Sequence, residues 1–189
     1  MIPVAAALNS PLLQWREPIY IAAGFAGVVG MALIFLQPLL AARWMPGMTS
    51  ATSRKLHRIL GLLLVLAVFI HVAGLWVTSP PDVMDALTFR SPTPFAVWGV
   101  LAMWAIFAAA GLVLYRKRVP PKIWRPLHTS LVMIATIGTV VHAVLIDGTM
   151  EVFSKWILGL ACLSVLAAAT YRLRSWAILT KRKPHAQTK

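Results

Sequence analysis

Four of the five histidines in this 189-residue chain form two pairs with identical spacing. His57 and His71 are 14 positions apart, and so are His128 and His142. Each pair lies in an apolar stretch, where an imidazole is costly unless its ring nitrogens have partners. A neutral imidazole nitrogen is a good axial ligand for haem iron. The first chemistry that the pattern indicates is therefore bis-histidine ligation of haem.

The spacing fixes where the members of each pair lie on an α-helix. Fourteen residues are close to four turns, so both members share one face, about 40° out of alignment and ~21 Å apart along the axis. One histidine of each helix is then near each leaflet of a membrane. If the two helices run parallel, His57 is level with His128 and His71 with His142. Two facing pairs would hold two b-type haems stacked across the bilayer.

The composition predicts the elements that must carry these histidines. Hydrophobic residues make up 59% of the chain, charged residues 12%, and the mean hydropathy is +0.77, which is typical of an integral membrane protein. Charge-free windows long enough to cross the hydrocarbon core mark the expected spans. There are five such windows: 18–42, 59–81, 91–115, 126–146 and 156–171. We therefore predict an all-α integral membrane protein with a bundle of five transmembrane helices.

The last window is short, and we expect Lys155 and Arg172 beside it to keep their charges in the aqueous interface.

The windows divide the chain into three expected regions: an extracytoplasmic N-terminal lead (1–17), a haem-binding transmembrane domain (18–176) and a basic cytoplasmic tail (177–189). No glycine-rich nucleotide-binding loop is present, and the single cysteine, Cys162, excludes an internal disulfide.

The formal net charge of +13 would suggest nucleic acid as the partner of a soluble protein, but its distribution indicates membrane orientation instead. Loops 43–58 and 116–125 and the segment from 172 onward hold fifteen basic residues and no acid. The opposite side holds three basic and five acidic residues. The positive-inside rule makes the basic side cytoplasmic, with the N-terminus outside and the C-terminus inside. Windows 59–81 and 126–146 then run parallel, and no nucleic-acid partner is expected.

Neighbouring residues admit two interpretations each. Three arginines close to the inner histidine pair could bind haem propionates or serve only as topology determinants: Arg54, Arg58 and Arg125. Three glycines lie three or four positions from a histidine, where they could make room for a porphyrin or mark close helix packing: Gly61, Gly74 and Gly138.

Most remaining features are typical of membrane architecture. Trp104 and Phe107 could help electrons cross between two haems or could be core aromatics. Cys162 is expected to be a small buried apolar residue. Tryptophans near the span ends form an expected aromatic belt: Trp44, Trp76, Trp98, Trp124, Trp156 and Trp176.

These residues resemble the ferric-reductase-like transmembrane domain. That domain is shared by NADPH oxidases, ferric-chelate reductases and the haem membrane subunit of the bacterial periplasmic methionine-sulfoxide reductase system. The matching elements are H-x13-H in two helices separated by one other helix, the run Arg54-Lys-Leu-His57-Arg-Ile-Leu-Gly61, and Leu127-His128. The resemblance covers roughly residues 19 to 175. It implies that the four span histidines are haem iron ligands, with electrons passing from a cytoplasmic flavin through the inner haem to the outer one.

Differences from the family shape the remaining expectations. Larger members often have six helices and carry a cytoplasmic FAD and NAD(P)H domain after the last one, which this sequence lacks. We therefore expect the electron-transfer membrane component of an oxidoreductase, without catalytic residues of its own. Its flavin would come through a partner, a cytoplasmic flavin reductase, and its acceptor would be extracytoplasmic: ferric iron, dioxygen or a periplasmic reductase. In the methionine-sulfoxide reductase group the position of His57 is usually not histidine, so this chain is more similar to the oxidase and ferric reductase type.

The resemblance implies the inner (plasma) membrane of a bacterium. Two other functions remain open from the residues. One is a cytochrome b561-like quinol oxidoreductase, also helical and bis-histidine. The other is a non-redox helical membrane subunit or transporter component, whose histidines make interhelical polar contacts or carry protons.

Overall fold

A computed structural model describes residues 16–147, 150 and 152–173, and all the regular secondary structure in them is helical. The described residues form six helices: α2 (Pro18–Ala41), α3 (Ser50–Thr78), α4 (Pro80–Leu87), α5 (Pro94–Leu114), α6 (Pro121–Leu145) and α7 (Val152–Leu173). All except α4 are long and apolar enough to cross a membrane. The predicted all-α class with five spans is confirmed.

Helices α3, α6 and α7 begin before their charge-free windows, because a helix begins at its cap and not at the edge of the apolar core. Helix α3 begins at Ser50, where the Thr49 side chain accepts a hydrogen bond from the Thr52 amide at 3.2 Å. Helix α6 begins at Pro121, whose ring suits the first helical position. The basic residues that precede His57 and His128 are therefore helical. The short helix α4 was not anticipated from the windows.

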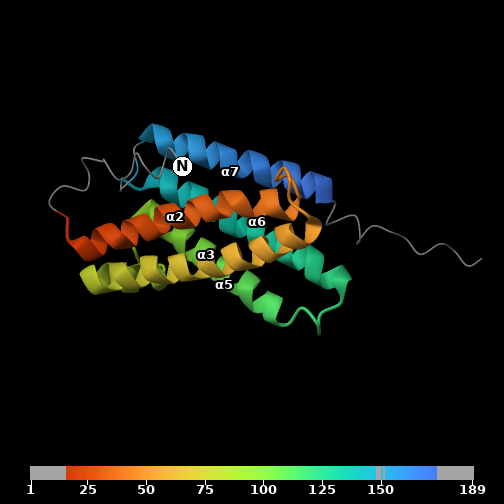
Figure 1. Cartoon of the computed structure of the whole chain (residues 1–189). Helices are drawn as coiled ribbons and strands as arrows, with labels where there is room; N and C mark the ends of the chain where they lie inside the picture. The colour runs from red at the N-terminus through yellow and green to blue at the C-terminus, as the bar shows by residue number, and fades with distance from the viewer. Residues whose placement is uncertain (1–15, 148–149, 151, 174–189) are drawn as a thin grey trace, which may run out of the picture.

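The spanning helices lie side by side along one direction (Figure 1). In that view α3 and α6 both run from right to left, while α2, α5 and α7 run the opposite way. The connections 42–49 and 115–120 therefore lie at one end of the bundle, which we call the basic end. Helix α4 and the segment that follows α6 lie at the other end, which we call the acidic end.

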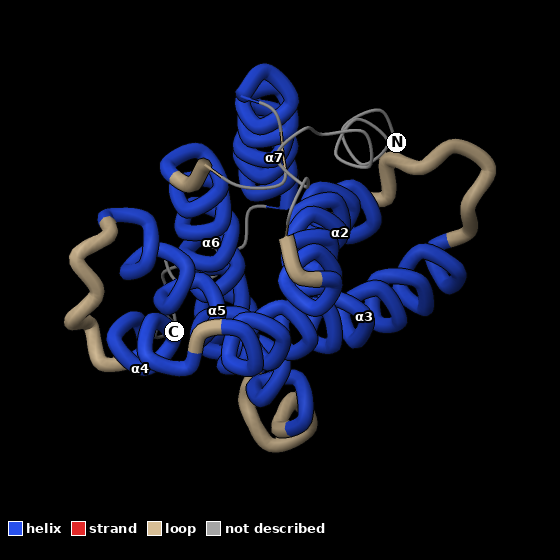
Figure 2. Tube along the Cα trace, turned by 90° about the vertical axis from the view of Figure 1, so that its left-hand side faces the viewer, coloured by secondary structure: helices blue, strands red, loops and turns tan. Residues whose placement is uncertain are grey.

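Two antiparallel hairpins form most of the bundle. Helix α2 packs along α3, and α5 packs along α6, with a smaller contact between α3 and α5. Helix α7 lies on α2 and α6, on the side of the bundle away from α3 and α5 (Figure 2). The α3 and α6 helices, which carry the histidines, therefore belong to different hairpins.

The interior is apolar, and so is most of the surface around the spans. Cys162 is 1% exposed and packs near Met31, as expected for a small buried residue. Large aliphatic and aromatic side chains such as Leu62, Phe69 and Phe153 point outward and are well over half exposed. Exposed apolar residues over helices of this length are what lipid contact requires.

The charged residues separate between the two ends of the bundle. Loop residue Arg43 and the first turns of α3 and α6 lie at the basic end, and Arg172 reaches that end too, since its guanidinium carbon lies 5.6 Å from the centre of the Trp44 ring. Asp82 and Asp85 lie on α4 at the acidic end. Which end faces the cytoplasm stays a prediction from the charges. The N-terminal lead up to residue 15, Trp176 and the basic tail lie outside the described residues.

The expectation that Lys155 keeps its charge in water is wrong. Lys155 is only 4% exposed, and its Nζ donates a hydrogen bond to the Ile146 carbonyl at 2.7 Å. Helix α7 starts at Val152, so Lys155 lies inside its first turn and faces the end of α6. The charge-free window did not reveal this contact, because it arises between two helices.

Two of the glycines next to histidines serve close helix packing. A Cβ at Gly74 would lie 2.8 Å from the Ala23 Cβ of α2, and one at Gly138 would lie 2.9 Å from the Trp98 carbonyl oxygen of α5. Both positions let neighbouring backbones approach, as small residues do in membrane bundles. The alternative, that they leave space for a porphyrin, is not what their surroundings show.

Replacement of Gly74 by alanine should therefore destabilise the bundle. The added Cβ meets another Cβ, which cannot move without shifting a backbone, and overpacking of this kind costs about 1–3 kcal/mol. We expect Gly74→Ala to lower the melting temperature of the protein in detergent. Gly111→Ala is the matched control, because nothing lies within 4 Å of a Cβ there. An equal loss in both variants would contradict the assignment of Gly74 to the α2–α3 contact.

Candidate functional site

The imidazole rings of His71 and His142 lie close together near the acidic end of the bundle. Their centroids are 6.3 Å apart, and their planes are nearly perpendicular, at 82°. The two residues are far apart in sequence and are brought together because α3 and α6 run in the same direction. We call them the outer pair.

Hydrogen bonds to the neighbouring helices define the tautomer of both rings. His71 Nδ1 lies 2.7 Å from the Ala23 carbonyl oxygen of α2, and His142 Nδ1 lies 2.9 Å from the Phe95 carbonyl oxygen of α5. A carbonyl oxygen can only accept, so each Nδ1 carries the proton and donates it. In a neutral ring the lone pair is then on Nε2, which is free to bind a metal. Donation of the second nitrogen to a carbonyl is the usual support of a metal-bound histidine.

Two glycines on the neighbouring helices make these contacts possible. A Cβ at Gly27 would lie 3.0 Å from His71 Nδ1, and a Cβ at Gly99 would lie 2.7 Å from His142 Nδ1. Each glycine comes four residues, about one turn, after the carbonyl that accepts the hydrogen bond. Any larger residue there would push the ring away from its acceptor.

The separation of the outer rings is suitable for two ligands of one metal. Metal–imidazole bonds are about 2 Å long and the ring centre lies roughly 1 Å beyond the nitrogen, so two rings on opposite sides of a metal have centroids about 6 Å apart. The observed 6.3 Å matches that arrangement. Among the described residues no group of three or more His, Cys, Asp or Glu side chains comes together, so the histidines meet as a pair.

Both rings line a cavity of about 450 Å³ between α2, α3, α4, α5 and α6. Its volume is within the range of cofactor sites, roughly 300–1,000 Å³. Apolar side chains such as Val28, Met103 and Ile106 line its interior. Toward the acidic end the lining becomes polar, with side chains from α4 and the loop before α5, and with Lys155. An apolar cavity with two free imidazole nitrogens and a polar rim is suited to a haem.

His57 and His128, the inner pair, lie at the basic end and are arranged differently. His57 Nδ1 lies 3.2 Å from the Gln37 carbonyl oxygen, so this ring also has its proton on Nδ1. The ring of His128 instead stacks on Trp124, with centroids 4.9 Å apart and planes at 9°. The Arg116 guanidinium covers Trp124 at 5.1 Å. The close ring contact of the outer pair is not repeated here.

Three buried polar atoms at the basic end have no hydrogen-bond partner among the described residues: Gln37 Oε1, Trp124 Nε1 and His128 Nδ1. Buried polar groups are nearly always satisfied, so each of these atoms calls for a partner that the described residues do not supply. They surround the inner histidines, where a second bound group is expected.

The exposure and contacts of the remaining candidate residues, three arginines and two tryptophans, bear on the interpretations that the sequence left open. All three arginines, Arg54, Arg58 and Arg125, are exposed at the basic end. Trp104 is 56% exposed and rests against Phe107 with ring centroids 6.1 Å apart, so it is not a core aromatic. Trp124, expected only as part of an aromatic belt, also contacts a candidate ligand.

A protein-family model matches residues 23–139, more than half of the chain, and its description is "Ferric reductase like transmembrane component". The chain belongs to the ferric-reductase-like transmembrane family. Among curated proteins and solved structures nothing matches significantly. Membership indicates a redox electron-transfer component embedded in a membrane, which agrees with the resemblance seen in the sequence. The matched region includes three of the span histidines and both ring-contacting glycines, and it ends three residues before His142.

Sequence reasoning missed Gly27 and Gly99, although it singled out glycines on the histidines' own helices. The sequence contains only a weak indication of this role, which is that Gly27 and Gly99 each lie in the spanning helix that packs along a histidine helix. Only the register between helices shows which glycine faces which ring.

Replacement of Gly99 by alanine should displace the His142 ring and break its hydrogen bond to Phe95. If the outer pair binds haem, we expect the Gly99→Ala protein to retain at most half of the haem at that site. Gly27→Ala should have a smaller effect, because its Cβ would be 3.0 Å and not 2.7 Å from the facing nitrogen. Haem content per chain, measured beside the Gly111→Ala control, checks both. Full haem content in Gly99→Ala would contradict this role.

Proposed function

We propose that this chain is a dihaem b-type cytochrome. It carries electrons across the membrane from a cytoplasmic flavoprotein to an acceptor on the other side. His71 with His142, and His57 with His128, would be the axial ligands of the outer and the inner haem. The family gives the redox class, and the two histidine pairs extend it to this arrangement.

The geometry of the outer pair supports the proposal most directly. Two rings with free Nε2 atoms, at the separation that one metal requires, face a cavity large enough for a cofactor. A polar contact between helices would need no cavity beside the two rings. The combination therefore favours a bound haem over the non-redox alternative.

Haem supplies one-electron chemistry when it is bound. The polypeptide would contribute the position of the ligands and a cavity with an apolar interior. Ala23 and Phe95 hold the outer rings in the ligating tautomer through their carbonyl oxygens. The apolar interior would surround the haem with a low dielectric, which is one of the means by which proteins tune a haem potential.

The distribution of charge supports the direction of electron flow. Exposed arginines and lysines from the loops at the basic end would attract an acidic flavoprotein and, by the positive-inside rule, place that end in the cytoplasm. The outer pair would then lie toward the opposite aqueous phase, which in a bacterial inner membrane is the periplasm. Ferric iron, dioxygen and a periplasmic reductase remain the candidate acceptors.

Haem stoichiometry tests the proposal. Purified protein from haem-replete cells should contain two b haems per chain by pyridine haemochrome. His71→Ala or His142→Ala should each reduce this to about one, because the outer pair loses a ligand while the inner pair is intact. His185→Ala, the fifth histidine, is the matched control and should keep both.

A colourless preparation would contradict any haem function and favour a non-redox subunit. One haem in the unaltered protein, or unchanged content in both outer-pair variants, would contradict the dihaem assignment. Rapid reduction by quinol without a flavoprotein would contradict the proposed donor and favour a cytochrome b561-like role.

The angle between the outer rings gives a spectroscopic prediction. Nearly perpendicular axial imidazoles leave two iron d orbitals close in energy, so a ferric low-spin site of this kind has a strongly anisotropic electron paramagnetic resonance spectrum. At 82° the outer site should show this signal, and His71→Ala should abolish it. A spectrum typical of parallel rings that disappears in His71→Ala would contradict the ring geometry.

A further inference from the structure

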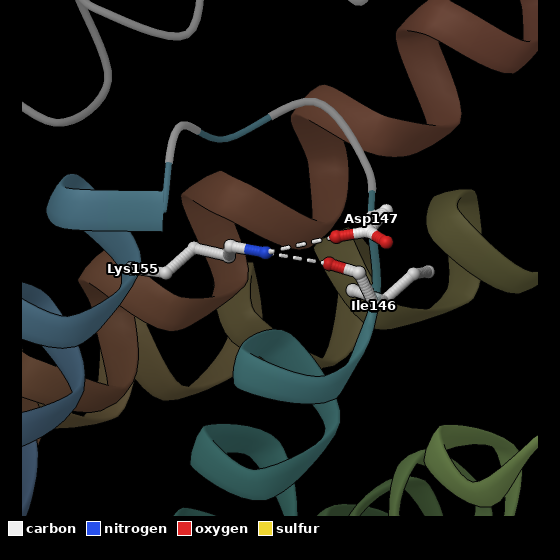
Figure 3. Close-up of polar contacts among 3 residues, drawn as sticks. All are labelled: Ile146, Asp147 and Lys155. Carbon is white, nitrogen blue, oxygen red and sulfur yellow. Dashed lines mark hydrogen bonds and ion pairs between the residues drawn. The ribbon is translucent and has the colours of Figure 1, made fainter.

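Lys155 is the one charged residue that is buried in the described part of the chain. It lies in the first turn of α7, at the acidic end, and its ammonium group points toward the segment that follows α6 (Figure 3). Burying an ion costs several kcal/mol even after relaxation, so its surroundings must compensate for the lost hydration.

The contacts of Lys155 with the residues that the structure describes compensate only in part. Nζ donates to the Ile146 carbonyl at 2.7 Å and lies 4.0 Å from Asp147 Oδ1 (Figure 3). The Asp147 side chain is fully exposed, so water screens this ion pair and it contributes little. An ammonium group has three donors, and among residues 16–147, 150 and 152–173 only one acceptor lies at hydrogen-bond distance from Nζ. A desolvated cation with a weak counter-charge is a site for an anion.

Lys155 also lines the cavity that contains the outer histidines. Its acceptor, Ile146, comes four residues after His142, so the ammonium group lies about one helical turn, ~5–6 Å, beyond that ring along α6. This is the rim of the cavity on the side of the acidic end. A flat group bound between the outer rings would present its edge to this rim.

We propose that Lys155 is an anion-binding residue of the outer cavity and that it binds a propionate carboxylate of the haem held by His71 and His142. This inference rests on the proposed function and assigns one of the contacts of that site. A charge-assisted hydrogen bond to carboxylate would satisfy a free donor and neutralise the buried charge. The arginines considered from the sequence are all at the basic end, so the outer site would otherwise lack a buried cation.

The acids around the rim do not neutralise the Lys155 ammonium group in place of a propionate. Asp82 and Asp85 line the same cavity, but both are exposed on α4, and Asp82 accepts a hydrogen bond from Ser79 Oγ at 2.5 Å. Their charges are hydrated, while that of Lys155 is not. The negative charges of these acids make the rim less favourable for free anions. A haem propionate would bind there more readily than a free anion, because the histidines would hold the same haem through its iron.

The test compares haem b with its dimethyl ester, in which both carboxylates are blocked. A His128→Ala chain isolates the outer site, and Soret titration of the haem-free protein gives the dissociation constant of each ligand. We expect haem b to bind at least tenfold more tightly than the ester, as a charge-assisted hydrogen bond predicts. Lys155→Gln should reduce that ratio to near one, and Lys155→Arg should preserve most of it.

Arg90→Gln is the matched control, because Arg90 is an exposed cation at the same end and is not among the residues that line the cavity. It should leave the ratio unchanged. If Lys155→Gln weakens haem and ester equally, Lys155 only secures the end of α6 and the proposal is overturned. A ratio near one in the His128→Ala parent overturns it without any Lys155 variant. A parent that binds neither ligand contradicts the dihaem function itself, which is a separate outcome.

Discussion

The outer site depends on two hydrogen bonds in which an imidazole on one helix donates to a backbone carbonyl on the next. His71 bonds to Ala23 and His142 bonds to Phe95, each within its own hairpin. These bonds determine the tautomer, the direction in which each Nε2 points and the register of α2 on α3 and of α5 on α6. Because α3 and α6 run in the same direction, the two rings, which belong to different hairpins, come to a centroid separation of 6.3 Å. Ligand geometry and helix packing are therefore set by the same contacts.

The inner pair shows what happens when this contact changes. His57 lies 14 residues before His71 on α3, and Gln37 lies 14 residues after Ala23 on the antiparallel helix α2. These two residues form the same kind of hydrogen bond, with a longer distance of 3.2 Å from His57 Nδ1 to the Gln37 carbonyl oxygen. On α6 and α5 the corresponding residues are His128, 14 before His142, and Ala109, 14 after Phe95. His128 Nδ1 has no hydrogen-bond partner among the described residues. At the level corresponding to the ring-contacting glycine of α5, the chain has Val113. A branched side chain there leaves less room for a ring to approach its acceptor, which agrees with the stack of His128 on Trp124.

Much of this arrangement could be predicted from the sequence, since hydropathy and histidine spacing depend only on helix geometry. The five spans, the levels of the four histidines and the separation of charges followed from these rules. Features that depend on contacts between helices could not be predicted. Gly27 and Gly99 act on rings of other helices, and Lys155 is buried because the end of α6 offers it a carbonyl. Helix α4 was missed because its eight residues carry two acids and never form an apolar window.

The two sites consequently differ in how much of their structure exists before a ligand binds. At the outer site both proton-bearing nitrogens are satisfied and a cavity is open, so a ligand meets atoms already in place. At the inner site Gln37, Trp124 and His128 each hold a buried polar atom that has no partner in the described part of the chain, and such atoms cost about 1–3 kcal/mol each. A ligand that satisfied them would recover that free energy. A ligand at the inner site would therefore gain from new polar partners, whereas a ligand at the outer site would enter a cavity that is already formed.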